Sequence, residues 1–305
     1  MRAITLIYNP ASGTLLELAA EAELPVYFKS LLAAFPDVQV TLVAFKGDQL
    51  NQLKQTLKRT PPEAVWVAGG DGTVLAVANL TESLNIPLGV LPGGTMNLLA
   101  RDIGMSLTMQ MAIRQLIHAD VEYIDRAEIN GRPFLCISNF GMSTKLTERR
   151  ERLRRHAGWI RWPMMLGYML KSMFMYPPIH IRLEENGKVH QLRTRAVTVT
   201  NNPLAAESTI IPMRCALNQG VLGVYVTRDR SIWSLPRLIF RLLIGDWQED
   251  EDMLIFKASS VKVSVRRRKR KLKTMSDGEL FRDKLPLKYR IHSRVLPILK
   301  PGVMP

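Results

Sequence analysis

Three short turns carry the residue types that bind phosphate in many proteins. The turns are Asn9–Gly13, Gly69–Thr73 and Gly93–Asn97, and each follows an apolar run that predicts a strand. A glycine-rich turn lets the backbone approach an anion closely, and a helix that follows adds its N-terminal N–H groups. The carboxyl ends of parallel strands meet at one edge of a sheet, where ligands bind. The three turns together therefore predict a phosphate site, in which Asp71 could help to position Mg²⁺ or a nucleotide hydroxyl.

A second candidate for chemistry is the acidic run Asp277-Gly278-Glu279. Phosphoryl transfer requires charge neutralisation, alignment and a base near the attacking hydroxyl, and carboxylates can supply these. The composition alone also fits a hairpin turn with a solvated glutamate, so both interpretations stay open at this point. The chain contains neither the P-loop pattern nor the dinucleotide-binding pattern, and this argues against the two commonest nucleotide-binding folds.

The elements expected around the three turns alternate between strand and helix over residues 1–125. This alternation predicts an α/β domain in three layers, with a parallel sheet covered by helices on both faces. The expected strands are Ala3–Tyr8, Val38–Phe45, Ala64–Ala68 and Ile86–Leu91, and the expected helices are Leu15–Phe35, Asp48–Thr60 with Asp48 as its cap, and Val74–Leu84.

The pattern changes to mostly strand over residues 126–285. Asn130-Gly131 is a strong hairpin signal, because both residues tolerate positive φ. Further strands are expected at Ile179–Glu184, His190–Thr200, Val221–Thr227, Leu254–Lys257 and Val261–Val265, with helical insertions near Thr144–Met175 and Ser231–Leu243. The chain is therefore expected to hold an N-terminal α/β domain and a β-rich second domain.

The formal charge of +15 implies an anionic partner. Basic residues are concentrated in two segments, Arg266–Lys271 and the Arg149–Trp162 region, where arginines accompany two tryptophans. Both segments favour an anionic membrane surface, although an edge strand and an ordinary packed helix remain alternatives. Nucleic acid is disfavoured, because no aromatic residues interleave the run Arg266–Lys271. The oligomeric state is left open.

The expected location is cytoplasmic. The chain has only two cysteines, Cys136 and Cys215, and shows neither a secretory signal nor an apolar stretch long enough to span a bilayer. A membrane contact would therefore be peripheral, and we expect it at the inner face.

The chain resembles the diacylglycerol kinase catalytic-domain family, which includes bacterial lipid kinases and sphingosine kinases. The segments that carry the resemblance are Asn9–Gly13, Gly69–Thr73, Pro92–Asn97 with Ala100-Arg101, Ile124-Asp125 before Asn130-Gly131-Arg132, and Asp277–Glu279. The resemblance implies a two-domain lipid kinase that uses ATP and Mg²⁺, with an N-terminal parallel-sheet nucleotide-binding domain and a C-terminal β-sandwich lipid-binding domain. ATP and the lipid headgroup would meet in a cleft between the domains, and residues 286–305 would return to the first one.

The resemblance also assigns roles to individual residues. Asp277 would be the general base that accepts a proton from the lipid hydroxyl, oriented by Glu279, with a pKa low enough to stay ionised. The metal-binding set would be Asp71, Asp125, Asp277 and Glu279, with Gln219 a doubtful member. The nucleotide-binding residues would be Asn9, Pro10, Ser12, Gly13, Gly69, Gly70, Asp71, Gly72, Thr73, Gly94, Thr95 and Asn97.

Three positions depart from the family pattern. Leu98 stands where many members have an acid after Asn97, Leu75-Ala76 replaces an Asn-Glu pair, and Gln219-Gly220 replaces an Asp-Gly pair. A neutral amide is a poorer ligand than a carboxylate for a hard cation. The main hypothesis is therefore an ATP-dependent lipid kinase acting on diacylglycerol or a related lipid, and the alternative is a catalytically weakened regulatory protein that binds nucleotide or lipid.

Overall fold

The computed structural model places the chain in two compact units, each described here by itself. It describes residues 2–21, 23–141, 178–185, 187–205, 213–214, 216–229, 237–238, 241, 246–265 and 270–302. Unit 1 comprises Met1–Arg126, Ala216–Gln219 and His292–Pro305, and unit 2 comprises Ala127–Cys215 and Gly220–Ile291. Among the described residues, no helix has the length and apolar composition needed to cross a bilayer.

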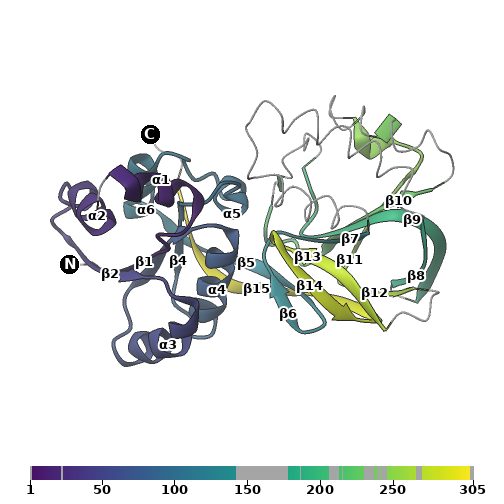
Figure 1. Ribbon diagram of the computed structural model, residues 1–305, viewed down its shortest axis with the longest axis horizontal. Helices are drawn as coiled ribbons and strands as arrows, with labels where there is room; N and C mark the ends of the chain where they lie inside the picture. The colour runs from purple at the N-terminus through teal and green to yellow at the C-terminus, as the bar shows by residue number, and fades with distance from the viewer. Residues whose placement is uncertain are drawn as a thin grey trace. The chain divides into compact units, whose positions relative to one another are not determined.

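Unit 1 is built on a parallel sheet with the strand order β15-β4-β3-β1-β2 (Figure 1). Strand β3 is buried along its whole length and β1 along most of it, as expected for central strands covered on both faces. The strands are β1 (Arg2–Tyr8), β2 (Val38–Ala44), β3 (Ala64–Gly69), β4 (Leu88–Pro92) and the C-terminal part of β15 (Leu287–Lys300).

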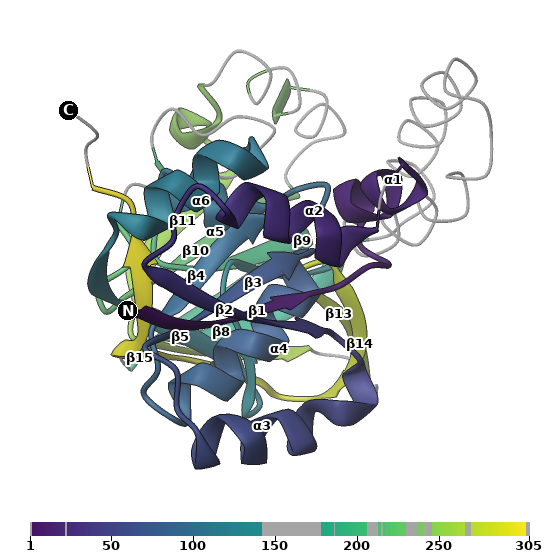
Figure 2. The ribbon, with the colours of Figure 1, turned by 90° about the vertical axis from the view of Figure 1, so that its left-hand side faces the viewer.

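Helices cover both faces of this sheet, so the predicted three-layer arrangement is confirmed. Helices α1, α2, α5 and α6 lie on one face, and α3 and α4 lie on the other (Figure 2). The helices are α1 (Gly13–Glu21), α2 (Leu24–Leu32), α3 (Leu50–Arg59), α4 (Asp71–Glu82), α5 (Leu98–Asp102) and α6 (Met109–Ile117).

Three details of the predicted helices are wrong. The expected helix Leu15–Phe35 is two helices, and the second begins at Leu24 with a proline in its first turn. Asp48 does not cap α3, because a 3₁₀ turn at Gly47–Gln49 comes first and Gln49 occupies the cap position. Helix α4 begins at Asp71 instead of Val74, so most of the turn Gly69–Thr73 belongs to its first helical turn.

Unit 2 is a β-sandwich-like arrangement of mainly antiparallel strands around one apolar core, which includes Phe134, Phe140, Val199, Val224 and Tyr289. The order along its main sheet is β14-β13-β7-β9-β8-β12-β15, while β10 pairs with β9 and β11. The strands are β6 (Arg132–Phe134), β7 (Ile137–Gly141), β8 (Ile179–Glu185), β9 (Lys188–Asn201), β10 (Leu222–Arg228), β11 (Met253–Ala258), β12 (Ser260–Val265), β13 (Lys271–Ser276) and β14 (Glu279–Lys284).

Two tight turns of unit 2 follow the hairpin chemistry expected from the sequence. Asn130 and Gly131 both have positive φ and connect β5 (Asp120–Ile129) to β6. Asp277 and Gly278 have φ values of 46° and 87° and connect β13 to β14. The predicted strand-to-strand turn is therefore confirmed at Asp277 and Gly278, and Glu279 is the first residue of β14.

The unit boundaries differ from the predicted domain limits at three places. The first boundary lies after Arg126, one residue beyond the expected limit, and the C-terminal return to unit 1 begins at His292 instead of residue 286. Ala216–Gln219 also belongs to unit 1, because Leu217 accepts the backbone N–H of Asp125. The Arg149–Trp162 region and residues 266–269 lie outside the described residues, as do residues 144–175 and most of 231–243.

Candidate functional site

The three predicted phosphate turns of unit 1 lie side by side. They follow β1, β3 and β4, which are neighbours in the parallel sheet. The Asn9 side chain donates to the Thr73 hydroxyl at 2.8 Å, and the Ser12 hydroxyl donates to the Gly93 carbonyl at 3.0 Å. Because these bonds join all three turns, the prediction that they meet at one sheet edge is confirmed.

Glycine is required where the turns touch each other. A Cβ on Gly93 would lie 2.5 Å from the Gly69 nitrogen, and a Cβ on Gly94 would lie 2.6 Å from the Gly70 Cα. A Cβ on Gly13 would meet the Thr95 hydroxyl at 2.7 Å. These glycines therefore allow close approach of backbones. Gly70 is different, because a Cβ there would meet no atom within 4 Å.

Asn97 fixes the shape of the third turn. It adopts a left-handed conformation with φ of 50°, its Oδ1 accepts the Gly94 N–H at 2.8 Å, and its Nδ2 donates to the Gly94 carbonyl at 2.8 Å. Pro10 and Thr95 are exposed at the turns, so they are available to a ligand.

The N-terminus of α4 lies directly after β3, with Gly70 at the cap position. No side chain caps this end of the helix. The first N–H groups of a helix lack intrahelical acceptors, and together with the helix dipole they favour an anion. An open Gly70 and an uncapped helix fit a phosphate group better than they fit a purely structural turn.

Asp71 occupies the first position of α4 and is partly buried. Its Oδ1 accepts the backbone N–H of Leu98 at 2.8 Å, which ties α4 to α5. Burial raises the pKa of Asp71, and the N–H of Leu98 opposes this effect. The carboxylate is therefore held in place but is poorly solvated, and a cation beside it would favour its ionised form.

The other predicted metal residue of unit 1, Asp125, has a structural contact. It is fully buried, and its Oδ1 accepts the N–H of Arg294 at 2.8 Å. Within neither unit do the described residues contain a group of three or more His, Cys, Asp or Glu side chains that could hold a metal ion. Mg²⁺ commonly uses one or two carboxylates together with substrate phosphates, and Asp71 beside the phosphate turns fits that mode.

Asp277, the predicted general base, is an anchored carboxylate in unit 2. Its Oδ2 accepts the N–H of Leu135 at 2.6 Å, and its Oδ1 accepts those of Cys136 and Ile137, both at 2.9 Å. Backbone N–H groups therefore orient Asp277, in place of the expected Glu279. Burial raises the pKa of Asp277, which is the opposite of the low value expected from the sequence. Glu279 is exposed on the next strand.

Arg214 supports the same backbone segment from its other side, and sequence reasoning missed it. The side chain is buried, and its Nη1 donates to the carbonyls of Leu135 at 2.7 Å and Asn201 at 2.6 Å. Its charge lowers the pKa of Asp277, against the larger effect of burial. An isolated arginine in a loop gives no pattern from which this contact could have been predicted.

The departures from the family pattern are now explained in part. Leu98 is buried, with 7% of its surface exposed, so an apolar side chain packs where the family pattern has an acid. Gln219 is exposed in unit 1, and Leu75 and Ala76 are half-buried on α4. Arg101 is a residue of α5 whose Nε donates to the Met96 carbonyl at 3.0 Å, in agreement with its expected role as a helix residue.

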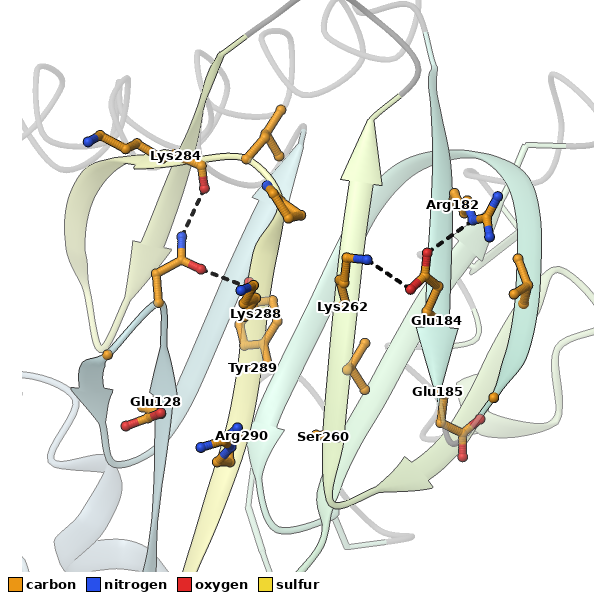
Figure 3. A pocket seen from close by; sticks show the side chains of 17 residues that line it. Glu128, Arg182, Glu184, Glu185, Ser260, Lys262, Lys284, Lys288, Tyr289 and Arg290 are labelled. Atoms are coloured by element: carbon orange, nitrogen blue, oxygen red, sulfur yellow. Dashed lines mark hydrogen bonds and ion pairs between the residues drawn. The ribbon is translucent and has the colours of Figure 1, made fainter.

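Unit 2 also has an open hollow of about 820 Å³ lined by charged side chains (Figure 3). Glu184 in this hollow pairs with Lys262 at 3.0 Å and with Arg182 at 3.1 Å. Lys284, Lys288 and Arg290 line it as well. Such a lining suits an anion or water better than an acyl chain.

Comparison with known proteins identifies relatives of both units. The family model of the diacylglycerol kinase catalytic domain matches residues 3–129, and that of the YegS C-terminal NAD kinase beta sandwich-like domain matches residues 137–300. The diacylglycerol kinase of Bacillus subtilis (strain 168) is 29% identical over 288 residues, which are 92% of this chain and 90% of the relative. The diacylglycerol kinase of Staphylococcus carnosus (strain TM300) is 26% identical over 267 residues, which are 85% and 83% of the two chains.

A solved structure shares the fold. The crystal structure of a diacylglycerol kinase from Bacillus anthracis str. Sterne matches with a TM-score of 0.67 and 20% sequence identity, covering 99% of this chain and 97% of that one. At this identity the match supports the arrangement of strands and helices within the chain and leaves the chemistry to the site residues.

Proposed function

Because the chain belongs to the diacylglycerol kinase catalytic-domain family, we propose that it transfers the γ-phosphoryl group of ATP to the hydroxyl of diacylglycerol or a related lipid. The observation that carries this proposal is the geometry of unit 1 at the predicted phosphate site, where three turns are joined at neighbouring strand ends beside a helix whose cap residue is glycine. Catalysis of phosphoryl transfer consists mainly of positioning and electrostatic stabilisation, and a rigid set of N–H donors supplies both.

The residues of unit 1 would bind and orient the nucleotide. Gly70 leaves room for a phosphate group, and the N–H groups at the start of α4 face its negative charge. The Asn97 side chain fixes the position of Gly94 by a hydrogen bond, and the Asn9 side chain fixes the Thr73 hydroxyl in the same way. With Mg²⁺ bound, the metal would neutralise phosphate charge, and Asp71 is the carboxylate of unit 1 best placed to hold it.

Asp277 remains the proposed general base, but its basicity now rests on a raised pKa instead of the low pKa expected from the sequence. Its three N–H donors occupy two acceptor positions on Oδ1 and one on Oδ2, so Oδ2 keeps one position for a proton. A raised pKa makes the carboxylate a stronger base than an ordinary aspartate. Glu279 is exposed two residues after Asp277 in the sequence, and its carboxylate can add a second negative charge.

The test follows the γ-phosphoryl group of labelled ATP into a panel of lipids that includes diacylglycerol. Gly70→Val should abolish transfer while the protein stays folded, because a Cβ at this position meets no atom of the chain within 4 Å and the added side chain would occupy the space proposed for the phosphate. Gly47→Val is the matched control, since a Cβ there also meets no atom within 4 Å and lies on the 3₁₀ turn before α3. We expect it to keep full activity.

Two results would decide against the proposal. Wild-type protein that binds ATP and phosphorylates no lipid would favour the regulatory alternative, to which Leu98, Ala76 and Gln219 point. Gly70→Val protein with normal transfer would place the phosphates elsewhere in the chain.

A further inference from the structure

Strands β13 and β14 bring four cations together on one face of a two-stranded ribbon. In their antiparallel register Lys271 lies opposite Lys284, and Lys273 lies opposite Arg282. Residues directly opposite each other point to the same side of a sheet, and so do residues two apart on one strand. All four side chains are exposed. We call this surface, Lys271, Lys273, Arg282 and Lys284, the basic ribbon face.

This pairing costs stability, because like charges directly opposite each other repel. Protection of a sheet edge would explain the presence of these cations but not their placement in pairs opposite each other. Strand β14 pairs with β13 alone and is an edge strand, so Arg282 and Lys284 could discourage association with other sheets. Lys271 and Lys273 lie on β13 just before Thr274–Ser276, the stretch that pairs with β7, and their placement opposite Lys284 and Arg282 adds a repulsion that edge protection does not require.

The acidic residues of the ribbon lie on its other face. Asp283 pairs with Arg132 at 2.6 Å, and Glu279 has the same parity as Asp283 along β14. In the part of the chain that the structure describes, no carboxylate forms an ion pair with Lys271, Arg282 or Lys284. Lys271, Arg282 and Lys284 therefore carry positive charge that no described carboxylate pairs with.

An exposed apolar residue accompanies the cations. Leu280 lies on the same face as Arg282 and Lys284, since the three alternate along β14, and 40% of its surface is exposed. Lys284 also lines the hollow of unit 2, where Lys288 and Arg290 share the lining with three glutamates (Figure 3). Cations beside an exposed leucine match the two components of a bilayer interface, anionic headgroups and apolar chains.

We propose that the basic ribbon face, with Leu280, docks unit 2 on an anionic phospholipid membrane. This surface differs from the basic run Arg266–Lys271 of the sequence, with which it shares only Lys271. The inference rests on the proposed function to the extent that a kinase acting on membrane lipids must reach a bilayer. The anionic lipid headgroups relieve the repulsion between the cross-strand cations. Leu280 adds an apolar contact that salt does not screen.

The test measures partition of the full chain onto vesicles of phosphatidylglycerol and phosphatidylcholine, compared with vesicles of phosphatidylcholine alone. Each cation near an anionic membrane contributes about fivefold to the partition coefficient. The double variant Arg282→Gln/Lys284→Gln should therefore bind the anionic vesicles roughly 25-fold more weakly. The matched control removes two charges from exposed lysines of α3, Lys54→Gln/Lys58→Gln, and should bind like wild type.

A third variant separates a membrane from other anionic partners. Leu280→Ser should weaken vesicle binding at high salt and leave binding to inorganic polyphosphate and to single-stranded DNA unchanged. The docking proposal is wrong if the Arg282/Lys284 variant partitions like wild type, or if Leu280→Ser has no effect on vesicles.

Activity measurements distinguish this inference from the proposed function. With a short-chain, water-soluble diacylglycerol, the Arg282/Lys284 variant should keep wild-type turnover, whereas its turnover on diacylglycerol in anionic vesicles should fall with its binding. If the wild type phosphorylates no lipid, the kinase proposal is wrong. The vesicle-binding measurements would still show whether the basic ribbon face docks on an anionic membrane.

Discussion

Replacing Asp277 with asparagine should destabilise unit 2 as well as impair catalysis. The carboxylate accepts N–H groups from three consecutive residues, Leu135, Cys136 and Ile137, and is 4% exposed. Asparagine suits the left-handed backbone at this position, where φ is 46°, so the turn itself should tolerate the change. The effect of Asp277→Asn therefore comes from the loss of a charged acceptor.

The size of this effect follows from the three bonds. Hydrogen bonds to a charged group contribute about 1.5–3 kcal/mol each, against about 0.5–1.5 kcal/mol for neutral pairs. In the variant the amide oxygen can face Cys136 and Ile137, which weakens two bonds by about 1 kcal/mol each. The amide NH₂ then faces the N–H of Leu135, and a buried donor without a partner costs about 1–3 kcal/mol. Relief of the buried charge offsets part of this sum, so we expect a loss of about 2–3 kcal/mol in the free energy of unfolding.

Urea denaturation of Asp277→Asn, with Glu279→Gln as control, measures this loss. Glu279 is exposed and forms no ion pair with any residue that the structure describes, so its variant should unfold like wild type. Wild-type stability of Asp277→Asn, together with lost phosphoryl transfer, would refute the anchoring argument and leave a purely chemical role. A loss of activity in this variant alone cannot assign the base, because the anchored segment changes with it.

Further measurements test the other groups. Burial raises the pKa of Asp71, so its ionisation costs stability as pH rises through that pKa; Asp71→Asn should match wild type below pH of about 4 and be more stable at pH 7 in urea denaturation. In thermal denaturation ATP with Mg²⁺ should stabilise wild type more than ATP alone, and Asp71→Asn should lose that difference. Gly93→Ala should lower the unfolding free energy by about 1–3 kcal/mol, because its Cβ would lie 2.5 Å from the Gly69 nitrogen. Arg214→Met should cost about 2–5 kcal/mol in the same assay, since it leaves the carbonyls of Leu135 and Asn201 without this donor.

Much of the fold of unit 1 was predictable because local patterns and tertiary packing agree there. The apolar runs before Asn9, Gly70 and Gly93 become β1, β3 and β4, and their turns meet as a parallel sheet requires. Helix boundaries were less predictable. Pro25 fits the first turn of a second helix as well as it fits an interruption of one long helix, and only packing decides between them.

The identities of the candidate site residues were predictable from the sequence, but their burial, contacts and pKa values were predictable only in part. Residue types and spacing located Asp277 in a hairpin turn, but its burial depends on pairing of β13 with β7, strands more than a hundred residues apart. Arg214 and the like-charge pairs of the basic ribbon face depend on register between strands in the same way. Long-range pairing therefore determines the pKa and accessibility of these groups, which no local pattern encodes.

The start of α4 combines two features that cost stability in the absence of a ligand. Its cap residue Gly70 offers the first N–H groups no side-chain acceptor, and burial disfavours the ionised form of Asp71. A cap residue in place of Gly70 would satisfy N–H groups but would occupy the open space at that position. A phosphate group relieves the first cost and a cation relieves the second, so the two ligands should bind more tightly together than apart. The energetics of this single helix end thus favour a phosphate with a cation over either one alone, which is the form in which a kinase receives ATP.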